Sequence, residues 1–378
     1  MALHLAKTFP NVTIFDQKKI DESGLPHFIQ SHHVHLLNKR GVQLLQKLFP
    51  EIVNLMTPPH FIKLNFDQEV YWNGPLGKLS STPSNLGELY FFDQKELIKL
   101  LWAQIKSTAN IKIIEETKIT KHLHLENRFL FSCLGRNHAR GRSHSFLKVP
   151  SKLKYCSFKF KTNFFEQQNF KAIIHSTFGD LRDKGIVVIP ISDQEYLMTQ
   201  VARDFTLGPI EFLLSTDFPF KEQLANSIEP TTKPQQYAIG QGIYGRSLLK
   251  NGDPHVFILG DERISLNPIF GQGMCLSLEA INTIHELEQK DNLNSKSFNQ
   301  SIRSIYDNAW SLGTSEDRIL NSNFIMKKGY ELIQKIVLVY LRKMQTNAYL
   351  YEHFMKVINM QIPFSQTFRF RVLKELWK

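Results

Sequence analysis

Short apolar runs bounded by turn residues alternate, along the first third of the chain, with stretches whose apolar residues recur at helical spacing. Leu97, Leu100 and Leu101 show the helical pattern, because residues three and four apart share one face of an α-helix. Gly, Pro and Ser mark a loop over residues 74–85, and another loop is predicted from 24 to 38. The pattern predicts helices over residues 2–7, 39–48 and 94–106, and strands over 12–15, 61–66, 69–72, 111–114 and 128–133.

The middle third has a different pattern. Short alternating segments separated by polar turns are typical of an antiparallel sheet, and they cover residues 155–162, 170–178, 184–191 and 195–202. From about residue 254 a strand is again followed by a helix, and residues 297–378 read as predominantly helical. A cofactor lobe interrupted by a substrate lobe explains this order better than two sequential domains.

The predicted fold class is therefore α/β, or α+β for the chain as a whole, with a Rossmann-like lobe interrupted by an antiparallel β-rich lobe. The Rossmann-like lobe is discontinuous and takes residues 1–60, 90–150 and 250–295. The β-rich lobe takes 61–89 and 151–249, and 296–378 form a helical C-terminal region.

The chain opens on a helix and a strand that ends at Asp16, which is typical of the second half of a dinucleotide-binding βαβ unit. In such a unit an acidic residue about 20 positions after a glycine-rich turn binds a ribose hydroxyl. Asp16 has only fifteen residues before it, so the first strand and the glycine-rich turn would precede residue 1. Either the native product starts upstream or this element has been lost; an ordinary αβ start with a surface Asp16 is the alternative.

Composition narrows the class of protein. The chain has 378 residues, with 42% hydrophobic and 21% charged, as in an ordinary globular protein. It contains no apolar run of the roughly 18 residues that a membrane span needs, and no secretory signal. Three cysteines at unrelated spacings form neither a disulfide framework nor a zinc pattern. These features favour the cytoplasm.

The net charge of +11 has two interpretations. A basic protein attracts nucleic acid, acidic lipid headgroups or phosphorylated cofactors, but scattered, solvated lysines give the same balance. The lysines are not clustered, and no nucleic-acid motif accompanies them, so no nucleic-acid partner is predicted.

The most informative segment is the buried strand at 256–259, followed by Gly260-Asp261 and by a Pro-x-x-Gly-x-Gly string at 268–273. A carboxylate at the carboxyl end of such a strand can accept hydrogen bonds from sugar or ribityl hydroxyls. Glycines at 271 and 273 allow close backbone approach to a flat ligand, and the helix that begins near Gly273 directs its N–H groups and positive dipole end there.

This string resembles the second FAD-binding motif of the para-hydroxybenzoate-hydroxylase-like flavin monooxygenases, the aromatic-ring hydroxylases. The resemblance makes the discontinuous lobe an FAD-binding lobe and extends along most of the chain, with the N-terminal element missing. It implies that Gly260-Asp261 contacts the ribityl chain of FAD. Beside the isoalloxazine it places Pro268, Gly271, Gln272, Gly273 and Met274.

The same resemblance implies two further cofactor contacts. The family has a basic residue near the pyrophosphate in the early loop, where His33 and His35 stand, and Gln or Arg at the helix start where Gln94 stands. A polar surface loop is the alternative for the histidines. No carboxylate pattern accompanies their His-x-His spacing, so no metal site is predicted.

Three features depart from the family. The glycine-rich turn is absent. Leu134 stands where many members carry the Asp of an Asp-Gly pair that is linked to FAD and the nicotinamide coenzyme, and Asp93 stands where a subgroup often has Arg. Nearby basic residues would either bind phosphate or form a solvated basic loop: Arg136, Arg140 and Arg142.

The resemblance implies an FAD-dependent monooxygenase that hydroxylates or epoxidises a small hydrophobic aromatic or alkene substrate. NADH or NADPH would reduce FAD, and reduced flavin would react with oxygen to give a flavin hydroperoxide, while the protein supplies orientation and electrostatics. The sequence identifies no catalytic acid or base. Apolar residues of the β-rich lobe either roof a dry pocket or are simply core: Phe158, Phe160, Ile173, Ile174, Val187, Val188 and Ile189.

Other functions stay open. A related flavin reductase of prenyl or other alkene substrates would carry the same motifs, whereas a flavin halogenase would need a Trp-x-Trp signature that the four separate tryptophans do not form. A flavin-free binding protein on a decayed flavoenzyme fold would explain the missing glycine turn. Residues 326–343 combine apolar and basic side chains, so this helix would either touch a membrane surface peripherally or pack against the protein.

Overall fold

The computed structural model describes residues 1–17, 19, 33–74, 77–78, 87–117, 129–137, 146–175, 184–192, 194–238, 240–246, 253–268, 271–315, 317–318, 335–336 and 338–377. Most of the two predicted loops and all of 118–125, Arg140, Arg142 and 326–334 lie outside the described residues. The described helices are α1 (Ala2–Thr8), α2 (Lys39–Leu48), α3 (Pro50–Leu55), α4 (Phe66–Glu69), α5 (Gln94–Ser107), α7 (Pro209–Leu214), α8 (Lys221–Ser227), α9 (Gly273–Glu288), α10 (Ser295–Gly313), α13 (Ala348–Ile358) and α14 (Phe370–Trp377). Short 3₁₀ turns are η2 (Phe164–Gln167), η3 (Gly260–Glu262) and η5 (Phe364–Phe368).

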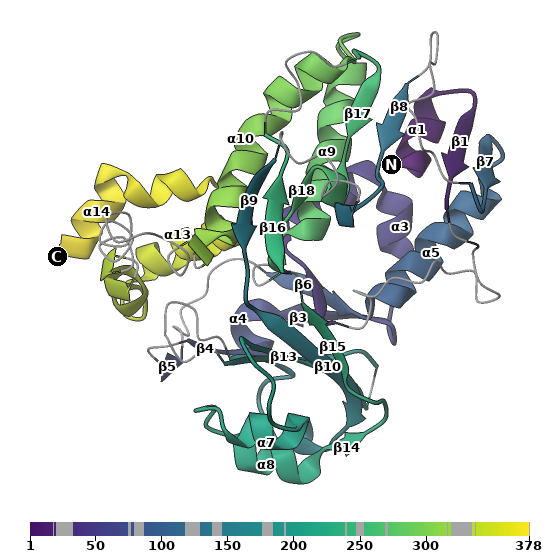
Figure 1. The fold of residues 1–378 in the computed structure, drawn as a ribbon. Coiled ribbons are helices and arrows are strands. Elements are labelled where there is room, and N and C mark those ends of the chain that lie inside the picture. Colours follow the sequence, from purple (N-terminus) through teal and green to yellow (C-terminus); the bar gives the residue numbers. More distant parts are fainter. Residues whose placement is uncertain are drawn as a thin grey trace.

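The largest sheet has eight strands and lies in the lower part of Figure 1. All its pairs are antiparallel except β4 with β11, which are parallel. The antiparallel sheet predicted for the middle third is confirmed. Its strands, in spatial order, are β14 (Glu229–Pro230), β10 (Lys154–Lys161), β13 (Glu195–Ala202), β12 (Gly185–Pro190), β11 (Ala172–His175), β4 (Val70–Gly74) and β5 (Gly77–Lys78), with β15 (Gln235–Ala238) also beside β10.

Four smaller sheets form the remainder of the described β-structure. Two are parallel pairs: β1 (Val12–Phe15) with β7 (Ile111–Ile114), and β8 (Leu130–Ser132) with β17 (Val256–Ile258). The other two are antiparallel: β2 (His35–Leu37), β6 (Glu88–Phe92) and β3 (Phe61–Asn65) form one, and β18 (Ile264–Ser265), β16 (Gln241–Tyr244) and β9 (Leu147–Pro150) form the other. Figure 1 shows the two parallel pairs in the same upper part of the molecule, with α9 and α10 beside β17 and α5 below β1 and β7.

Two local predictions are corrected. The predicted strands at 61–66 and 69–72 are separated by the short helix α4, because Asn65 caps it and accepts hydrogen bonds from the N–H groups of Asp67 and Gln68. The predicted loop before residue 39 contains strand β2, which pairs His35 with Phe92 of β6 across more than fifty residues of sequence.

Helices α2 and α5 each begin after a polar residue that caps the helix. Asn38 precedes α2 and accepts from the N–H of Gly41, and Asp93 precedes α5 and accepts from the N–H of Lys95. Each cap satisfies an N–H group that the helix itself leaves without a partner. Helix α9, in contrast, begins after Gln272 without a side-chain cap.

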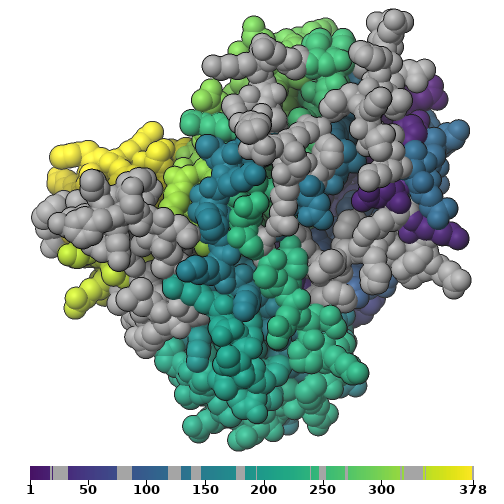
Figure 2. Space-filling model, viewed as in Figure 1, coloured from purple at the N-terminus to yellow at the C-terminus, as the bar shows by residue number. Residues whose placement is uncertain are grey.

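The C-terminal region is helical in the part described, as predicted, and its last helices, α13 and α14, lie on one flank of the molecule in Figure 2. Within the described residues, none of the helices combines the length and the hydropathy that crossing a bilayer requires. In the amphipathic segment Leu341 is buried in the main core and Val339 is exposed. Peripheral contact with lipid stays a prediction.

Candidate functional site

The site is built around the start of α9. The N–H of Gly271 donates to the carbonyl of Pro268 at 2.8 Å, which closes a turn, and Gly271 has a φ of +61° that a side chain would strain. A Cβ added at Gly271 would lie 3.9 Å from the carbonyl oxygen of Leu36, so the turn passes directly beside β2. A Cβ added at Gly273 would meet none of the described residues within 4 Å. The uncapped start of α9 is therefore open at Gly273 within the described part of the chain, and it presents N–H groups and a positive dipole end.

Strands β2 and β6 bring two other predicted residues to this turn. His35 pairs with Phe92, and two residues later Gln94 begins α5. Met274, the second residue of α9, packs against the cluster that contains Phe92. Gly271 thus lies beside β2, the strand that begins at His35, and Met274 packs against a cluster that includes Phe92 of β6, the strand that leads to Gln94.

Two amide oxygens near this turn are buried without a hydrogen-bond partner among the described residues: Oε1 of Gln94 and Oε1 of Gln272. Gln272 is itself almost fully buried. A buried acceptor without a donor costs free energy, on the order of 1–3 kcal/mol. Both oxygens are therefore suited to accept hydrogen bonds from a ligand.

Gly260 and Asp261 lie where β17 ends, in the 3₁₀ turn η3. Gly260 has a φ of +57°, and a Cβ added there would meet none of the residues that the structure describes within 4 Å. Asp261 is exposed, whereas its neighbour Glu262 is fully buried. Glu262 accepts from the hydroxyl of Ser132 at 2.7 Å and from the N–H of Leu134 at 2.9 Å, which fixes the ends of β17 and β8 to each other.

Asp16 belongs to a different sheet from Asp261. It follows β1, its N–H donates to the carbonyl of Ile114, and its carbonyl accepts from the N–H of Thr117. Its side chain is half-buried. The backbone of Asp16 is therefore fixed at the end of the β1–β7 pair, while the residues of the turn at α9 gather at β2 and β6.

Sequence reasoning missed a buried polar chain that joins the early loop to the large sheet. Nδ1 of His33 lies 2.7 Å from Oγ of Ser157, which lies 2.7 Å from Oγ1 of Thr199. The N–H of Val34 donates to the same Thr199 oxygen at 2.9 Å. This chain positions β2, and hence the strand beside Gly271, against the β-rich lobe.

A second polar chain holds the loop that leads to the turn. The hydroxyl of Tyr155 donates to Oδ1 of Asn267, and Nδ2 of Asn267 donates to Oγ of Ser151 at 3.1 Å. Asp317 also forms side-chain hydrogen bonds with Ser151 and Asn267, although burial raises its pKa above the usual range for Asp. Since Asn267 immediately precedes Pro268, this chain fixes the base of the turn.

Arg136, and Asp93 which departs from the family pattern, both have partners. Arg136 is buried and donates to the hydroxyl of Tyr237 at 2.6 Å, so the expected solvated loop is wrong at this residue. Asp93, besides capping α5, forms an ion pair with Lys159 at 2.6 Å. Both residues therefore help to join the lobes, because Tyr237 and Lys159 belong to the eight-stranded sheet.

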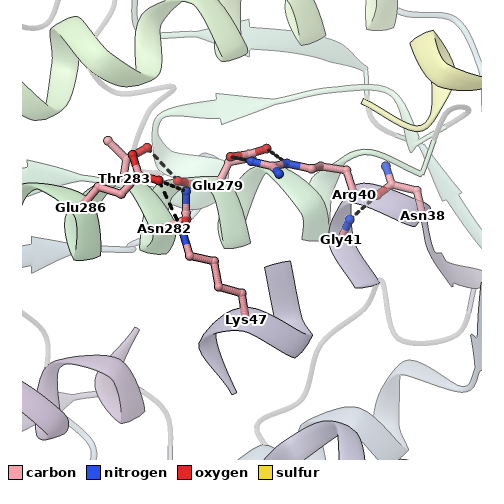
Figure 3. Close-up of polar contacts among 8 residues, drawn as sticks. All are labelled: Asn38, Arg40, Gly41, Lys47, Glu279, Asn282, Thr283 and Glu286. Atoms are coloured by element: carbon pink, nitrogen blue, oxygen red, sulfur yellow. Dashed lines mark hydrogen bonds and ion pairs between the residues drawn. The ribbon is translucent and has the colours of Figure 1, made fainter. Parts of the chain in front are cut away.

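Helices α2 and α9 are joined by ion pairs and hydrogen bonds that sequence reasoning also missed (Figure 3). Arg40 donates to Glu279 through Nε and Nη2, and Nζ of Lys47 lies 2.7 Å from Oδ1 of Asn282. Glu279, Asn282 and Glu286 recur at helical spacing, which was the available signal. An adjoining polar cavity of about 190 Å³ is smaller than the roughly 300 Å³ of ordinary small-molecule sites.

Comparison with known proteins gives the fold. No protein-family model and no curated protein sequence matches the chain. A flavoprotein/dehydrogenase from Cytophaga hutchinsonii superposes with a TM-score of 0.64 at 14% identity, over 92% of this chain and 86% of that chain. A probable FAD-dependent monooxygenase from Pseudomonas aeruginosa, pqsL, gives 0.62 at 15% identity, over 85% and 93%. The p-nitrophenol 4-monooxygenase PnpA from Pseudomonas putida DLL-E4 gives 0.60 at 10% identity, over 94% and 92%.

The mixed α/β class predicted from the sequence is confirmed by these superpositions. They cover most of this chain and most of each solved structure, and they include both the lobe with the α9 turn and the β-rich lobe. The chain has the fold of FAD-dependent monooxygenases.

Proposed function

We propose that the protein is an FAD-dependent oxidoreductase, and specifically a monooxygenase of a small hydrophobic aromatic or alkene substrate. The observation that carries the proposal is the turn from Pro268 to Gly273, which sets the uncapped start of α9 beside β2 with open space at Gly273. Reduced flavin is negatively charged at its pyrimidine edge, and a helix N-terminus stabilises negative charge. The shared fold with pqsL and PnpA supports the proposal.

The residues present fit a flavin. Gly260 and Gly273 leave open space where a larger residue would place a side chain, and the buried amide oxygens of Gln94 and Gln272 lack donors within the described residues. FAD offers ring N–H and ribityl O–H donors for such acceptors. Asp261 would accept from the ribityl hydroxyls, as its exposed position at the end of β17 allows.

The remaining cofactor contacts are proposals of the same kind. Asp16 would bind the ribose of the adenosine half, and His35 would lie near the pyrophosphate. Pro268, Gly271 and Met274 would contact the flavin ring by their backbone and apolar atoms. The chemistry that bound FAD would supply is the transfer of one oxygen atom of O₂ to the organic substrate, with two electrons from NADH or NADPH and release of the other oxygen atom as water.

The substrate is proposed to bind at the sheet face on which Ser157 of β10 lies. Alternation along β10 puts Phe158 and Phe160 on the other face, where they pack in a closed apolar cluster. The interpretation of these phenylalanines as core is thereby supported. His33 and Thr199 meet Ser157 on its side, so polar groups for orienting a substrate lie near the turn at α9.

The test is a titration of the purified chain with FAD, followed by its visible absorption and fluorescence quenching. We expect a bound-flavin spectrum that weakens at least tenfold in affinity in Asp261→Ala and in Gly271→Val. Gly240→Val is the matched control, since Gly240 also has a positive φ, +74°, and open space, but lies between β15 and β16. A chain that folds but binds no FAD at high concentration would contradict the proposal.

Two alternatives have their own readouts. An alkene reductase would oxidise NAD(P)H with substrate and consume no oxygen, whereas a monooxygenase couples the two. A flavin-free binding protein is favoured by one observation: within the described residues, β1–β7 and β8–β17 are separate two-stranded sheets and not one continuous sheet. Binding of a hydrophobic ligand by a chain that stays colourless would support this second candidate.

A further inference from the structure

A cluster of metal-ligating side chains lies at the opposite end of α9 from the glycine turn. His4 on α1 contacts Glu288 at the C-terminal end of α9, with Nε2 of His4 2.9 Å from Oε2 of Glu288. His285 lies one turn earlier, and its ring meets that of His4 edge to face at 5.3 Å. One ligand atom from each residue lies within 4.8 Å of the other two.

Only one of the two carboxylate oxygens of Glu288 has a hydrogen-bond partner among the described residues. The side chains of His4 and Glu288 are 4% and 8% exposed. Oε2 of Glu288 faces His4 and receives a long hydrogen bond of 3.4 Å from Thr8, but Oε1 is buried with no hydrogen-bond partner among the described residues. Burying a carboxylate oxygen without a donor is unfavourable, so a cation at this position would satisfy the oxygen.

The end of helix α9 suits a cation. His285 and Glu288 are three residues apart, so both side chains project from one face of α9. Carbonyl groups at a helix C-terminus carry partial negative charge, which favours a cation.

We propose that His4, His285 and Glu288 form a site for a divalent transition-metal ion, with zinc as the best fit. Two imidazoles and one carboxylate are a ligand set that zinc accepts, with water completing a tetrahedron. The ion would join α1 to the end of α9. An ordinary His4–Glu288 ion pair without metal is the competing interpretation. The proposal does not depend on the flavin.

The experiment is calorimetric titration of the full chain with zinc chloride after treatment with a chelator. One strong site per chain is expected. His285→Ala and Glu288→Gln should each weaken it at least tenfold, because each removes one of three ligands. The matched control is His60→Ala, since the His60 side chain is 57% exposed and lies 4.0 Å from Glu96 on another helix. This control should bind zinc as the unmodified chain does.

Cobalt absorption gives an independent readout, because a tetrahedral site with nitrogen and oxygen ligands produces intense visible bands that solvated cobalt lacks. His285 is half-buried, so its alanine variant is expected to fold, and circular dichroism checks this. Zinc binding of equal strength in the unmodified chain and in folded His285→Ala would overturn the proposal. Weak binding at several sites, with no 1:1 step, would also overturn it and leave the ion pair alone.

Discussion

Arg40 on α2 and Glu279 on α9 form a two-point ion pair, with Nε 2.6 Å from Oε1 and Nη2 3.2 Å from Oε2. The Glu279 side chain is 4% exposed and that of Arg40 is 34% exposed. A planar guanidinium that meets a carboxylate at two points fixes direction as well as distance. The pair therefore sets the orientation of α9 against α2, and with it the position of the turn that precedes α9.

Arg40→Met is expected to lower the free energy of unfolding by about 2 kcal/mol. The value lies between the ~3 kcal/mol cost of breaking a buried pair and the ~1 kcal/mol limit of an exposed one, because Glu279 is buried and Arg40 only partly so. Urea unfolding measures the change. Lys154→Met, which breaks an exposed pair with Asp204, is the control and should change stability little.

Tyr155→Phe is expected to cost about 1–2 kcal/mol of stability, since it removes the donor to the buried Asn267 and keeps the ring. The loop before Pro268 would lose one of its fixed points. Tyr196→Phe is the matched control, because Tyr196 is buried and stacked on Phe165 but forms no hydroxyl hydrogen bond within the described residues. Equal losses in the two variants, measured by urea unfolding, would show that the Tyr155 hydroxyl contributes nothing specific.

Gln272→Met separates stability from cofactor binding. Without flavin, the variant should be more stable by about 1 kcal/mol, because it removes a buried amide oxygen that has no donor. With flavin, affinity should fall about tenfold, since the same oxygen is proposed to accept from the ring. Thermal unfolding with and without FAD measures both effects. A variant less stable in both states would contradict a ligand-facing role.

Stability is expected to fall below pH 6.5 in a way that depends on His353. Burial, and then nearby Lys356 and Arg369, lower its pKa in the folded protein from the ordinary value of 6.5. Between the folded and the unfolded pKa of His353, the unfolded chain binds more protons than the folded protein. The stability linked to neutral His353 is therefore fully present above pH 6.5 and is lost as the pH falls. His353→Gln keeps a donor for Tyr340 and should flatten this loss. Urea midpoints measured from pH 8 to pH 5.5 check it, and an unchanged slope would count against His353.

Features decided locally were predictable from the sequence. Helices α2 and α5 begin at the predicted residues 39 and 94, and β17 is followed by a helix that begins at Gly273, as predicted. The fold class followed from the order of these elements. Strand β2 and helix α4 were missed, since one depends on pairing with β6 and the other on the Asn65 cap within an apolar run.

Most of the polar contacts around the site could not be predicted. His33 and Ser157 are 124 residues apart in the chain, and Val34 and Thr199 are 165 apart. Each of these hydrogen bonds joins two single residues far apart in the chain. Such a contact leaves no repeating pattern in the sequence, so the sequence does not identify the partner of a hydroxyl or imidazole group. The α9 glycine string was recognisable only because several of its features are adjacent in sequence.

The separate parallel pairs have a consequence for how the protein behaves in concentrated solution. Within the described residues β1 pairs only with β7, and Phe15 on β1 is 39% exposed. A strand that pairs on one side only presents free N–H and C=O groups on the other, which is a template for another chain. Concentrating or warming the protein should therefore produce strand-mediated self-association, visible as light scattering before global unfolding begins.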